Sequence, residues 1–508
     1  MTATEGVVLA LALGSVGVSG ARWLRVAQRE HYLPGSVARF QLLWMIRRPE
    51  NAVLWVVGLG SAVSAGWAVV AGAAAAVLNA LLPLGLSPRG RTSRLRWTWR
   101  LRRLAVASGA LLGAWLGLGG WVFGLVAAAV LATPFVAVLV DLATLVTVPL
   151  ERRLQRPFLT RARRRLAEVA PVVVAITGSY GKTSTKEHAA TLLGARFAVL
   201  ASPASFNNAM GLARTVNEHL VDGTEVLVAE MGAYGPGEIE AMRSWLGPRV
   251  GVITAIGPVH LERFGSLEAT LAAKAEILRG VEVAVLNVDD PRLLALAGGL
   301  GPGIRVVACS ATDRGADVWV DGSGEQTEVR VGGEPVGSVP PEAGDATNVA
   351  CAIGVAVALG LGPDDLRRGL GGLRRAGHRR EAVRGAAGAV VIDDTYNANP
   401  AGAAAALALL REVDGDGRRV VVTPGMVEMG RAQRSANERF AQEAAAVADE
   451  VVVVGRTNRA ALRAGAARGT ARVSEVATRE GAVELLRDRG VGPGDVVLFE
   501  NDLPDHYP

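Results

Sequence analysis

The pattern of hydrophobic and polar positions changes about a third of the way along the chain. Before that point, three stretches carry almost no charge, and they cover residues 6–21, 52–86 and 104–150. A bilayer is crossed by about 20 apolar residues, so the first stretch suits one pass and the third suits two. The middle stretch is long for one pass, and we interpret it as a tight hairpin that turns near Gly66. The pattern therefore predicts about five transmembrane helices.

After Pro171, short β-branched runs alternate with Ala- and Leu-rich segments of helical length. Four of these runs have the character of buried parallel strands, at 172–176, 225–231, 250–256 and 283–288. Such strands with helices between them form a doubly wound α/β sheet. We further expect a helix at 350–361 and a hairpin or small insertion at 317–337.

A second α/β set follows a Gly- and Arg-rich joint near 369–377, with strands expected at 389–393, 419–424, 449–455 and 495–500. The predicted fold class is α/β, in three parts. These are an N-terminal multi-pass α-helical membrane region (1–168), a P-loop doubly wound central domain (169–376) and a smaller Rossmann-like C-terminal domain (377–508).

Charge separates the same parts of the chain. Residues 1–165 hold 20 Arg, no Lys and five acidic residues, which is a net charge of +15. The whole chain carries +6, so the remainder carries −9, and this acidic balance argues against a nucleic-acid partner. The arginines cluster beside the apolar spans, so the positive-inside rule predicts a cell (inner) membrane protein whose residues after Arg152 are cytoplasmic. The lipid bilayer is then a partner, and two cysteines provide no disulfide framework.

The segment Gly178–Thr183 follows the first predicted strand and opens a helix. Glycines let backbone N–H groups turn toward phosphate, and the helix N-terminus adds partial positive charge. Lys182 supplies a compact ammonium where a planar guanidinium would not fit, and Thr183 is placed to bind Mg²⁺. The usual first glycine of such loops is replaced by Ile176. The segment nevertheless predicts a site for ATP and Mg²⁺.

Six motifs occur in order over about residues 170–460: ITGSYGKTSTKE, SPASFNNAMGLARTV, VAEMGAYGPGEI, VITAIGPVHLERFGSLEATLAAKAEIL, LNVDDP and VIDDTYNANP. Together they resemble the Mur ligases, most closely the MurF-type branch that adds D-Ala-D-Ala to a UDP-MurNAc-tripeptide. The resemblance implies an ATP-dependent carbon–nitrogen ligase. In this family ATP phosphorylates a carboxylate, an amine attacks the acyl phosphate, and inorganic phosphate leaves.

The resemblance also implies roles for individual residues. The implied catalytic residues are Lys182, Glu230, His260, Lys274 and Arg379, with Arg380 as the neighbour that could replace Arg379. The implied metal ligands are Thr183, Glu230, His260 and a carbamylated Lys274. Only a neutral primary amine captures CO₂, so arginine cannot serve at 274. Lys186 matches its motif as either a phosphate neighbour or a helix-surface charge.

The nucleotide and the substrates have implied contacts of their own. The implied nucleotide-binding residues are Gly178, Ser179, Tyr180, Gly181, Lys182, Thr183, Ser184, Asn348 and Asp394, the last of which reaches the ATP ribose. The implied substrate-binding residues are Asn207, Asn208, Tyr396, Asn397 and Asn399. The last three form a turn that resembles a helix N-cap.

Three departures from the family leave the acceptor open. Membrane spans replace the UDP-sugar-binding domain, Thr347-Asn348 replaces a His-Asn pair, and the chain ends LFENDLPDHYP. The first hypothesis is a membrane-anchored ligase that joins an amino acid or dipeptide amine to the carboxylate of a cell-wall (peptidoglycan) or other envelope precursor. The alternatives are a poly-γ-glutamate- or folylpolyglutamate-type ligase, and a non-catalytic nucleotide-binding membrane scaffold. The retained lysines and acids argue against the scaffold.

Overall fold

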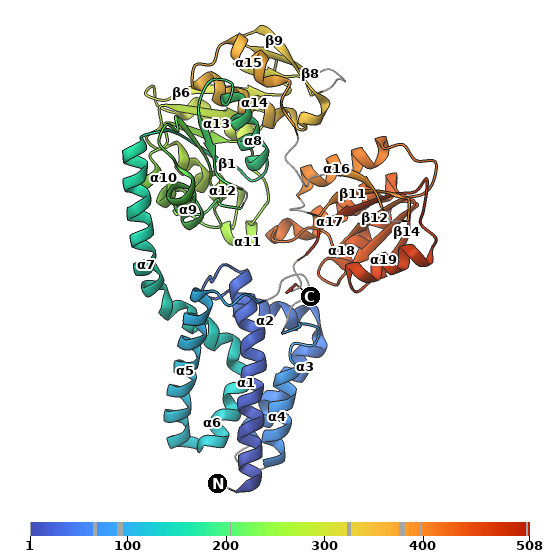
Figure 1. The fold of residues 1–508 in the computed structure, drawn as a ribbon. Helices are drawn as coiled ribbons and strands as arrows, with labels where there is room; N and C mark the ends of the chain where they lie inside the picture. Colours follow the sequence, from blue (N-terminus) through green and yellow to red (C-terminus); the bar gives the residue numbers. More distant parts are fainter. Residues whose placement is uncertain are drawn as a thin grey trace.

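The computed structural model describes residues 2–64, 69–88, 95–203, 205–322, 327–374, 381–385, 387–395, 399–503 and 506–507. The expected turn at Gly66 lies outside these residues. An elongated helical bundle carries the N-terminus, and two α/β sheet domains stand beyond one end of it (Figure 1). The α/β fold class predicted for the rest of the chain is confirmed.

The bundle contains seven α-helices among the described residues: α1 (Ala3–Arg29), α2 (Ser36–Arg47), α3 (Pro49–Val63), α4 (Val69–Leu81), α5 (Trp99–Phe123), α6 (Leu125–Ala132) and α7 (Val136–Val169). Three described segments are long and apolar enough to cross a membrane, namely α1, α5 and the run from α6 through α7. The predicted hairpin corresponds to α3 and α4, which pack on one another but are only 15 and 13 residues long. The number of passes therefore stays a prediction.

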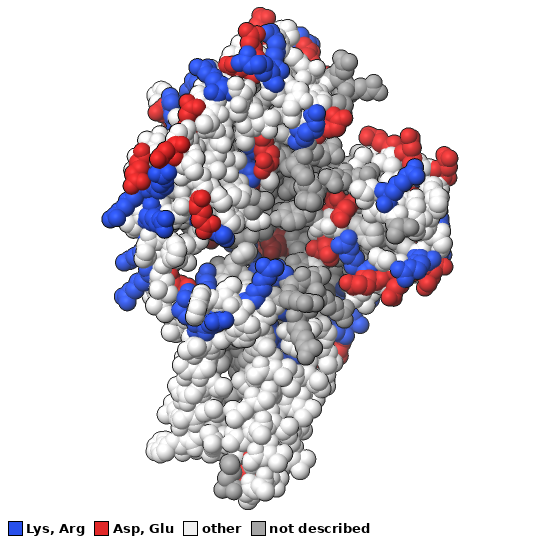
Figure 2. Space-filling view, in the orientation of Figure 1, with Lys and Arg blue, Asp and Glu red and all other residues white. Residues whose placement is uncertain are grey.

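The outer surface of the bundle is apolar. Large hydrophobic side chains that point outward include Val56, Val70, Val106, Leu118 and Trp121, the last with 87% of its surface exposed. Figure 2 shows almost no charged side chain on this face of the bundle, whereas the sheet domains are covered with both signs. A surface of this kind, over such an area, is typical of contact with lipid.

Helix α7 joins the bundle to the central domain. Its first half packs against α5, where Glu151 accepts two hydrogen bonds from Arg103, at 2.6 and 2.8 Å. Its second half leaves the bundle, and Leu159, Ala162 and Leu166 pack into the central-domain core (Figure 1). One continuous helix thus belongs to both parts.

The central domain is built on a nine-stranded sheet in the order β2-β3-β1-β4-β5-β6-β7-β8-β9. Its strands are β1 (Val172–Thr177), β2 (Val199–Ala201), β3 (Val226–Glu230), β4 (Val250–Ile253), β5 (Val283–Asn287), β6 (Arg305–Ser310), β7 (Val318–Val320), β8 (Thr327–Val331) and β9 (Glu334–Val339). Strands β2 to β7 are parallel, which confirms the four predicted parallel strands, and the expected hairpin appears as antiparallel β8 and β9. After β1 the chain forms β2 and β3 on one side of that strand, and β4 lies on its other side. A topological switch point therefore lies between β1 and β4.

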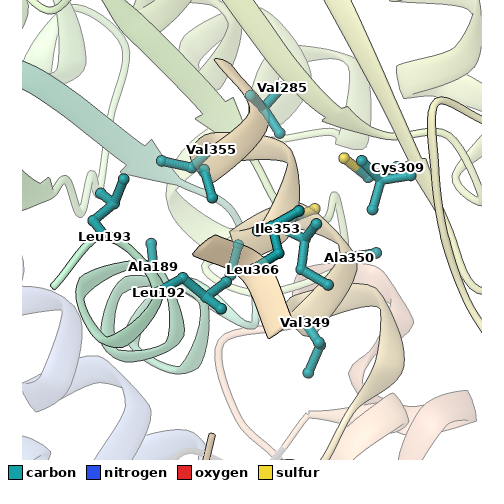
Figure 3. Close-up of a cluster of buried hydrophobic side chains, with 14 of the residues drawn as sticks. Ala189, Leu192, Leu193, Val285, Cys309, Val349, Ala350, Ile353, Val355 and Leu366 are labelled. Carbon is teal, nitrogen blue, oxygen red and sulfur yellow. The ribbon is translucent and has the colours of Figure 1, made fainter. Parts of the chain in front are cut away.

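Helices cover this sheet. They are α8 (Lys182–Leu193), α9 (Ala209–His219), α10 (Glu238–Leu246), α11 (Leu261–Phe264), α12 (Leu267–Ala275), α13 (Pro291–Gly299), α14 (Ala346–Ala358) and α15 (Pro363–Leu370). The predicted helix at 350–361 corresponds to α14, which lies in the core between α8 and the strands (Figure 3). Gly354 permits this packing, because a Cβ there would collide with Cys309 and Val285.

The C-terminal domain has a six-stranded sheet in the order β10-β11-β15-β12-β13-β14. Its strands are β10 (Glu381–Arg384), β11 (Val390–Asp394), β12 (Arg419–Thr423), β13 (Glu450–Val454), β14 (Arg472–Val476) and β15 (Val496–Glu500). Only β10 pairs antiparallel. Helices α16 (Pro400–Glu412), α17 (Gln433–Val447), α18 (Arg459–Ala466) and α19 (Arg479–Asp488) complete the domain. After β15 the chain returns to the bundle, where His506 and Tyr507 contact Phe40 and Trp44 of α2.

Candidate active site

The phosphate loop lies where β1 ends, at the topological switch point. Gly181 has a φ of 78° and precedes the first residue of α8, and a Cβ there would overlap the side-chain oxygen of Asn348. Ser179 fixes the loop to the segment that follows β4. Its N–H donates to Ala255 O at 2.8 Å, and its hydroxyl accepts from Gly257 N–H at 2.9 Å. A backbone concavity is therefore held open at the N-terminus of a helix, which is the geometry that binds phosphate.

Two side chains of the loop carry its chemistry. The Lys182 ammonium folds back over the loop and donates to the carbonyl oxygens of Gly178 at 2.8 Å and Ser179 at 3.3 Å. The hydroxyl of Thr183 donates to a carboxylate oxygen of Glu230 at 2.9 Å. The structure thus brings together the predicted phosphate-binding lysine and two of the predicted metal ligands.

Glu230 ends β3 and is buried. Besides Thr183, it accepts a hydrogen bond from the side-chain amide of Asn207 at 3.2 Å, and Lys186 lies 3.8 Å from it. Lys186 is fully buried and donates to Ser202 O at 2.8 Å. The interpretation of Lys186 as a helix-surface charge is therefore wrong. It is enclosed, and its nearest carboxylates are those of Glu187 at 3.0 Å and Glu230 at 3.8 Å, which sequence pattern alone did not reveal.

Lys274 lies on α12 and reaches the phosphate loop from the opposite side. Its ammonium donates to Gly178 O at 3.1 Å and the residue is only 4% exposed. Burial, reinforced by the charge of Lys182, lowers the pKa of Lys274 to about 7. A lysine with this pKa is substantially neutral at physiological pH, and the neutral amine is the form that reacts with CO₂.

His260 is held differently, because its partners come from other parts of the chain. Its Nδ1 is hydrogen-bonded to Glu428 of the C-terminal domain, and its ring meets the Tyr234 ring edge-on at 4.8 Å. Burial opposes ionisation of Glu428, but His260 and Arg263 outweigh it and lower the pKa of that carboxyl to about 2. Glu428 is therefore ionised. A carboxylate on one imidazole nitrogen orients the other toward a metal.

A cavity of about 430 Å³ opens beside the phosphate loop. Five of the predicted nucleotide or substrate residues line it, and they are Tyr180, Gly181, Ser184, Asn348 and Asn399. Asn399 comes from the C-terminal domain, so the cavity lies between the two sheet domains. Burial raises the pKa of Tyr180, which keeps its phenol neutral.

Polar residues for which the sequence predicted no role also line this cavity. Asp289, Asp290 and Arg292 line it, and Arg292 makes two hydrogen bonds of 2.8 Å to Asp290. Asn287, at the end of β5, donates to Thr254 O at 2.9 Å. These residues belong to the motif LNVDDP and its neighbour Arg292, so the motif was a signal that could have identified them.

Two of the predicted substrate residues cap helices, one predicted nucleotide residue lies away from the cavity, and others lie outside the described residues. Asn208 and Asn399 are helix N-caps, accepting from Gly211 N–H at 2.9 Å and Gly402 N–H at 2.8 Å, which confirms the predicted N-cap turn at 399. Asp394 is buried at the end of β11 and does not line the cavity just described. The predictions for Arg379 (with Arg380), Tyr396 and Asn397 lie outside the described residues.

The donor set fits ATP with a divalent cation. The loop offers backbone N–H groups, Lys182 offers positive charge, and Thr183 and Glu230 offer the oxygen ligands that Mg²⁺ prefers. The described residues hold no group of three or more His, Cys, Asp and Glu side chains close enough to bind a metal by themselves. A bound cation would therefore also need oxygens from phosphate or from a carbamate on Lys274.

Known proteins resemble the chain over both sheet domains. Residues 176–335 match the Mur ligase middle domain, and residues 378–500 match the Mur ligase glutamate ligase domain. A UDP-N-acetylmuramoyl-tripeptide–D-alanyl-D-alanine ligase of Bacillus subtilis is 30% identical over 358 residues, which cover 67% of this chain and 75% of that protein. The enzyme of the same name from Mycobacterium leprae is 33% identical over 368 residues, covering 65% and 70%.

The fold agrees with a solved structure. The MurF ligase of Thermotoga maritima in complex with ADP superposes with a TM-score of 0.57 at 25% identity, covering 68% of this chain and 80% of that one. The matched segments contain the phosphate loop, Glu230, His260 and Lys274. The chain therefore belongs to the Mur ligase family, whose members are ATP-dependent acid–amino acid ligases.

Proposed function

We propose that this protein is a membrane-anchored Mur ligase of peptidoglycan synthesis, which uses ATP and Mg²⁺ to form an amide on a cell-envelope precursor at the cytoplasmic face of the membrane. The observation that carries the proposal is the convergence of Lys182, Lys274 and the Thr183–Glu230 pair on one phosphate loop. A lysine ammonium, a second buried lysine and a buried carboxylate at one helix N-terminus favour binding of phosphate together with a cation.

The chemistry follows from joining two anions. A substrate carboxylate and the terminal phosphate of ATP repel one another, so positive charge must neutralise them as the acyl phosphate forms. Lys182 would hold the phosphate chain, while Thr183, Glu230, His260 and a carbamylated Lys274 would hold Mg²⁺. The Mg²⁺ ion supplies charge neutralisation of the phosphate oxygens. Closure of the interdomain cavity would exclude water from the acyl phosphate.

The relatives suggest the substrates. Their names give D-alanyl-D-alanine as the amine and a UDP-N-acetylmuramoyl-tripeptide as the acid. We propose the same dipeptide amine for this chain. The apolar bundle stands ahead of the matched segments, so we propose an acid that is presented at the membrane, with a lipid-linked muramoyl-peptide as the preferred form.

The test is acceptor-dependent ADP release by the full chain in lipid nanodiscs. D-Ala-D-Ala is supplied with either UDP-MurNAc-tripeptide or its lipid-linked form, and glutamate with a folate-type acid serves as the alternative pair. We expect release with the muramoyl acids, faster with the lipid-linked one, and none for Lys182→Ala. Release only with glutamate and the folate-type acid would overturn the proposed substrate class.

The membrane orientation has a separate test. A reporter fused after Pro508 should be cytoplasmic, because the arginine clusters favour that side. A reporter on the outer side would separate the ligase from its ATP and contradict the proposal.

A further inference from the structure

The turn between α1 and α2 lies against the His260 side of the ligase site. It contains Glu30 and His31, and Glu30 is a carboxylate with only 5% of its surface exposed. A buried carboxylate is costly unless it is paired. Glu30 accepts a hydrogen bond from Arg263 of the central domain at 2.8 Å, and its other oxygen lies 3.0 Å from Nε2 of His506 in the C-terminal tail. All three parts of the chain therefore meet at one buried carboxylate.

From Glu30 a chain of polar contacts reaches the His260 ring. Arg263 lies 3.5 Å from the Glu428 carboxylate, and the Tyr507 hydroxyl donates to the same carboxylate at 3.3 Å. Glu428 in turn is hydrogen-bonded to Nδ1 of His260. The orientation of the imidazole thus depends on Glu428, and the position of Glu428 depends on groups that Glu30 holds.

A second route starts from the next residue. The His31 ring stacks on the Tyr234 ring with centroids 5.1 Å apart, and Tyr234 makes the edge contact with His260. The Arg263 guanidinium also lies 4.8 Å from the Tyr234 ring centre, so it connects the two routes. Glu30 therefore restrains Nδ1 of His260 through Arg263 and Glu428. The adjacent His31 restrains the His260 ring through Tyr234.

The C-terminal tail closes this junction. Trp44 of α2 donates to the carbonyl oxygen of His506 at 2.8 Å, and Phe40 packs edge-on against both the His506 and Tyr507 rings. Tyr507 is part of the hydrophobic cluster at this end of the bundle. The tail is thereby anchored on the bundle while its side chains hold Glu30 and Glu428.

We propose that Glu30, acting through Arg263 and Glu428, is a positioning residue for His260, so that the membrane bundle completes the metal side of the ligase site. The inference rests on the proposed function, because it takes His260 as a metal ligand. Glu30 touches neither substrate nor metal. Removal of the Glu30 carboxylate should orient the His260 imidazole less firmly and weaken binding of the cation. The nucleotide should stay bound through the phosphate loop.

The experiment compares two isosteric changes in the full chain in nanodiscs. Glu30→Gln breaks the buried pair. Glu50→Gln is the matched control, because Glu50 also joins the bundle to the C-terminal domain, through Arg456 at 3.3 Å, but is exposed. Mn²⁺ binding is measured by electron paramagnetic resonance in the presence of the ATP analogue AMP-PNP, and AMP-PNP affinity is measured separately.

We expect Glu428→Gln to weaken Mn²⁺ binding by about 10-fold or more and Glu30→Gln by about 3- to 10-fold, since partners of a metal ligand typically contribute this much. AMP-PNP affinity should change by less than about twofold, and Glu50→Gln should match the wild type. The Glu30→Gln/Glu428→Gln double variant should lose less than the two single losses combined, because both act through His260.

Three results would overturn the inference. Glu30→Gln could equal Glu50→Gln, or its effect could be fully additive with that of Glu428→Gln. A wild-type protein that binds AMP-PNP but no Mn²⁺ would overturn the proposed metal site as well. Arg263→Lys breaks the same contacts from the central domain and carries the same expectation, so a poorly folded Glu30→Gln protein does not remove the test.

Discussion

The two sides of the ligase site are built in opposite ways. On the phosphate side, Lys182, Thr183, Glu230 and Lys274 all belong to the central domain, and their partners are neighbouring backbone carbonyls and side chains of that domain. On the other side, His260 depends on Glu428 of the C-terminal domain and, through it, on the bundle and the tail.

Nucleotide binding and assembly of the His260 side are therefore distinct properties of the site. We expect the phosphate side, whose groups all belong to the central domain, to bind the phosphates of a nucleotide even when the His260 side is disturbed. The His260 side exists only when three parts of the chain have met. Single substitutions should separate these two behaviours, and the change at Lys182 should affect turnover most.

Lys182→Ala should reduce ATP turnover by about 10³-fold or more. Each 1.4 kcal/mol of lost transition-state stabilisation is about tenfold in rate, and an unneutralised phosphate charge in a dry cleft costs several such steps. Steady-state ADP release measures the loss. Turnover within a few-fold of the wild type would remove the phosphate-loop assignment.

Lys274→Arg should lose about 10²-fold or more, as should Lys274→Ala, while AMP-PNP still binds. Arginine keeps a positive charge but cannot form a carbamate. The direct measurement is a carbamate carbon signal in ¹³C NMR after addition of ¹³C-bicarbonate, which the wild type should show and the Lys274→Arg protein should lack. A fully active Lys274→Arg enzyme would show that position 274 requires only charge.

The pH dependence of turnover should follow from the same lysine. Because its pKa is lowered to about 7, the amine is mostly neutral above that pH and mostly protonated below it. Carbamylation needs the neutral amine, so activity should fall as the pH drops through 7 toward 6. Added bicarbonate should shift this fall to lower pH, and a profile insensitive to bicarbonate would argue against the carbamate.

Tyr507→Phe should have a smaller effect, confined to the assembled side. It removes one hydrogen bond to Glu428 and keeps the ring packed on Phe40. We expect the Mg²⁺ concentration for half-maximal activity to rise about two- to threefold, consistent with about 0.5 kcal/mol for one such bond. An equal rise for the AMP-PNP dissociation constant would show that the two sides are not separable.

Asn208→Ala should affect stability alone. The side chain caps α9 and lies outside the contacts of both sides, so the loss is that of an N-cap, about 1 kcal/mol of unfolding free energy. Thermal unfolding measures the change, with Asn208→Asp as the control that retains the cap. A large increase in the KM of the acid substrate would restore the predicted substrate role of Asn208.

The sequence predicted the phosphate loop because local pattern determines it, since a strand, a glycine turn and a helix N-terminus are adjacent in the chain. The roles of Glu230 and Lys274 were implied by the resemblance of their motifs and stay predictions, although the structure places both side chains beside the loop. Strands β2, β6, β10 and β14 were not predicted, and of these β2 is three residues long and β14 is half polar.

The assembled side could not be predicted in the same way. Glu30 and Glu428 are ordinary acids in sequence, and Glu428 lies 168 residues from His260, whereas Glu30 lies still farther from it. Burial and a positive φ at His260 and Glu428 become visible only in three dimensions. Lys186 illustrates the same limit, because only the fold shows that its ammonium is enclosed.

Helix α7 also sets a distance between the bundle and the central domain. From Arg152, where the arginine cluster begins, to Val169, where the helix ends, the rise of 1.5 Å per residue gives roughly 27 Å along the axis. In the proposed membrane arrangement, the far half of this helix is part of the central-domain core, so the helix would limit how far the catalytic centre can stand from the lipid headgroups. A lipid-tethered acid would need a reactive carboxylate at about that height. The length of the substrate between its lipid and its carboxylate would then determine which acids react. Shortening or lengthening α7 by whole turns would change the preferred substrate length.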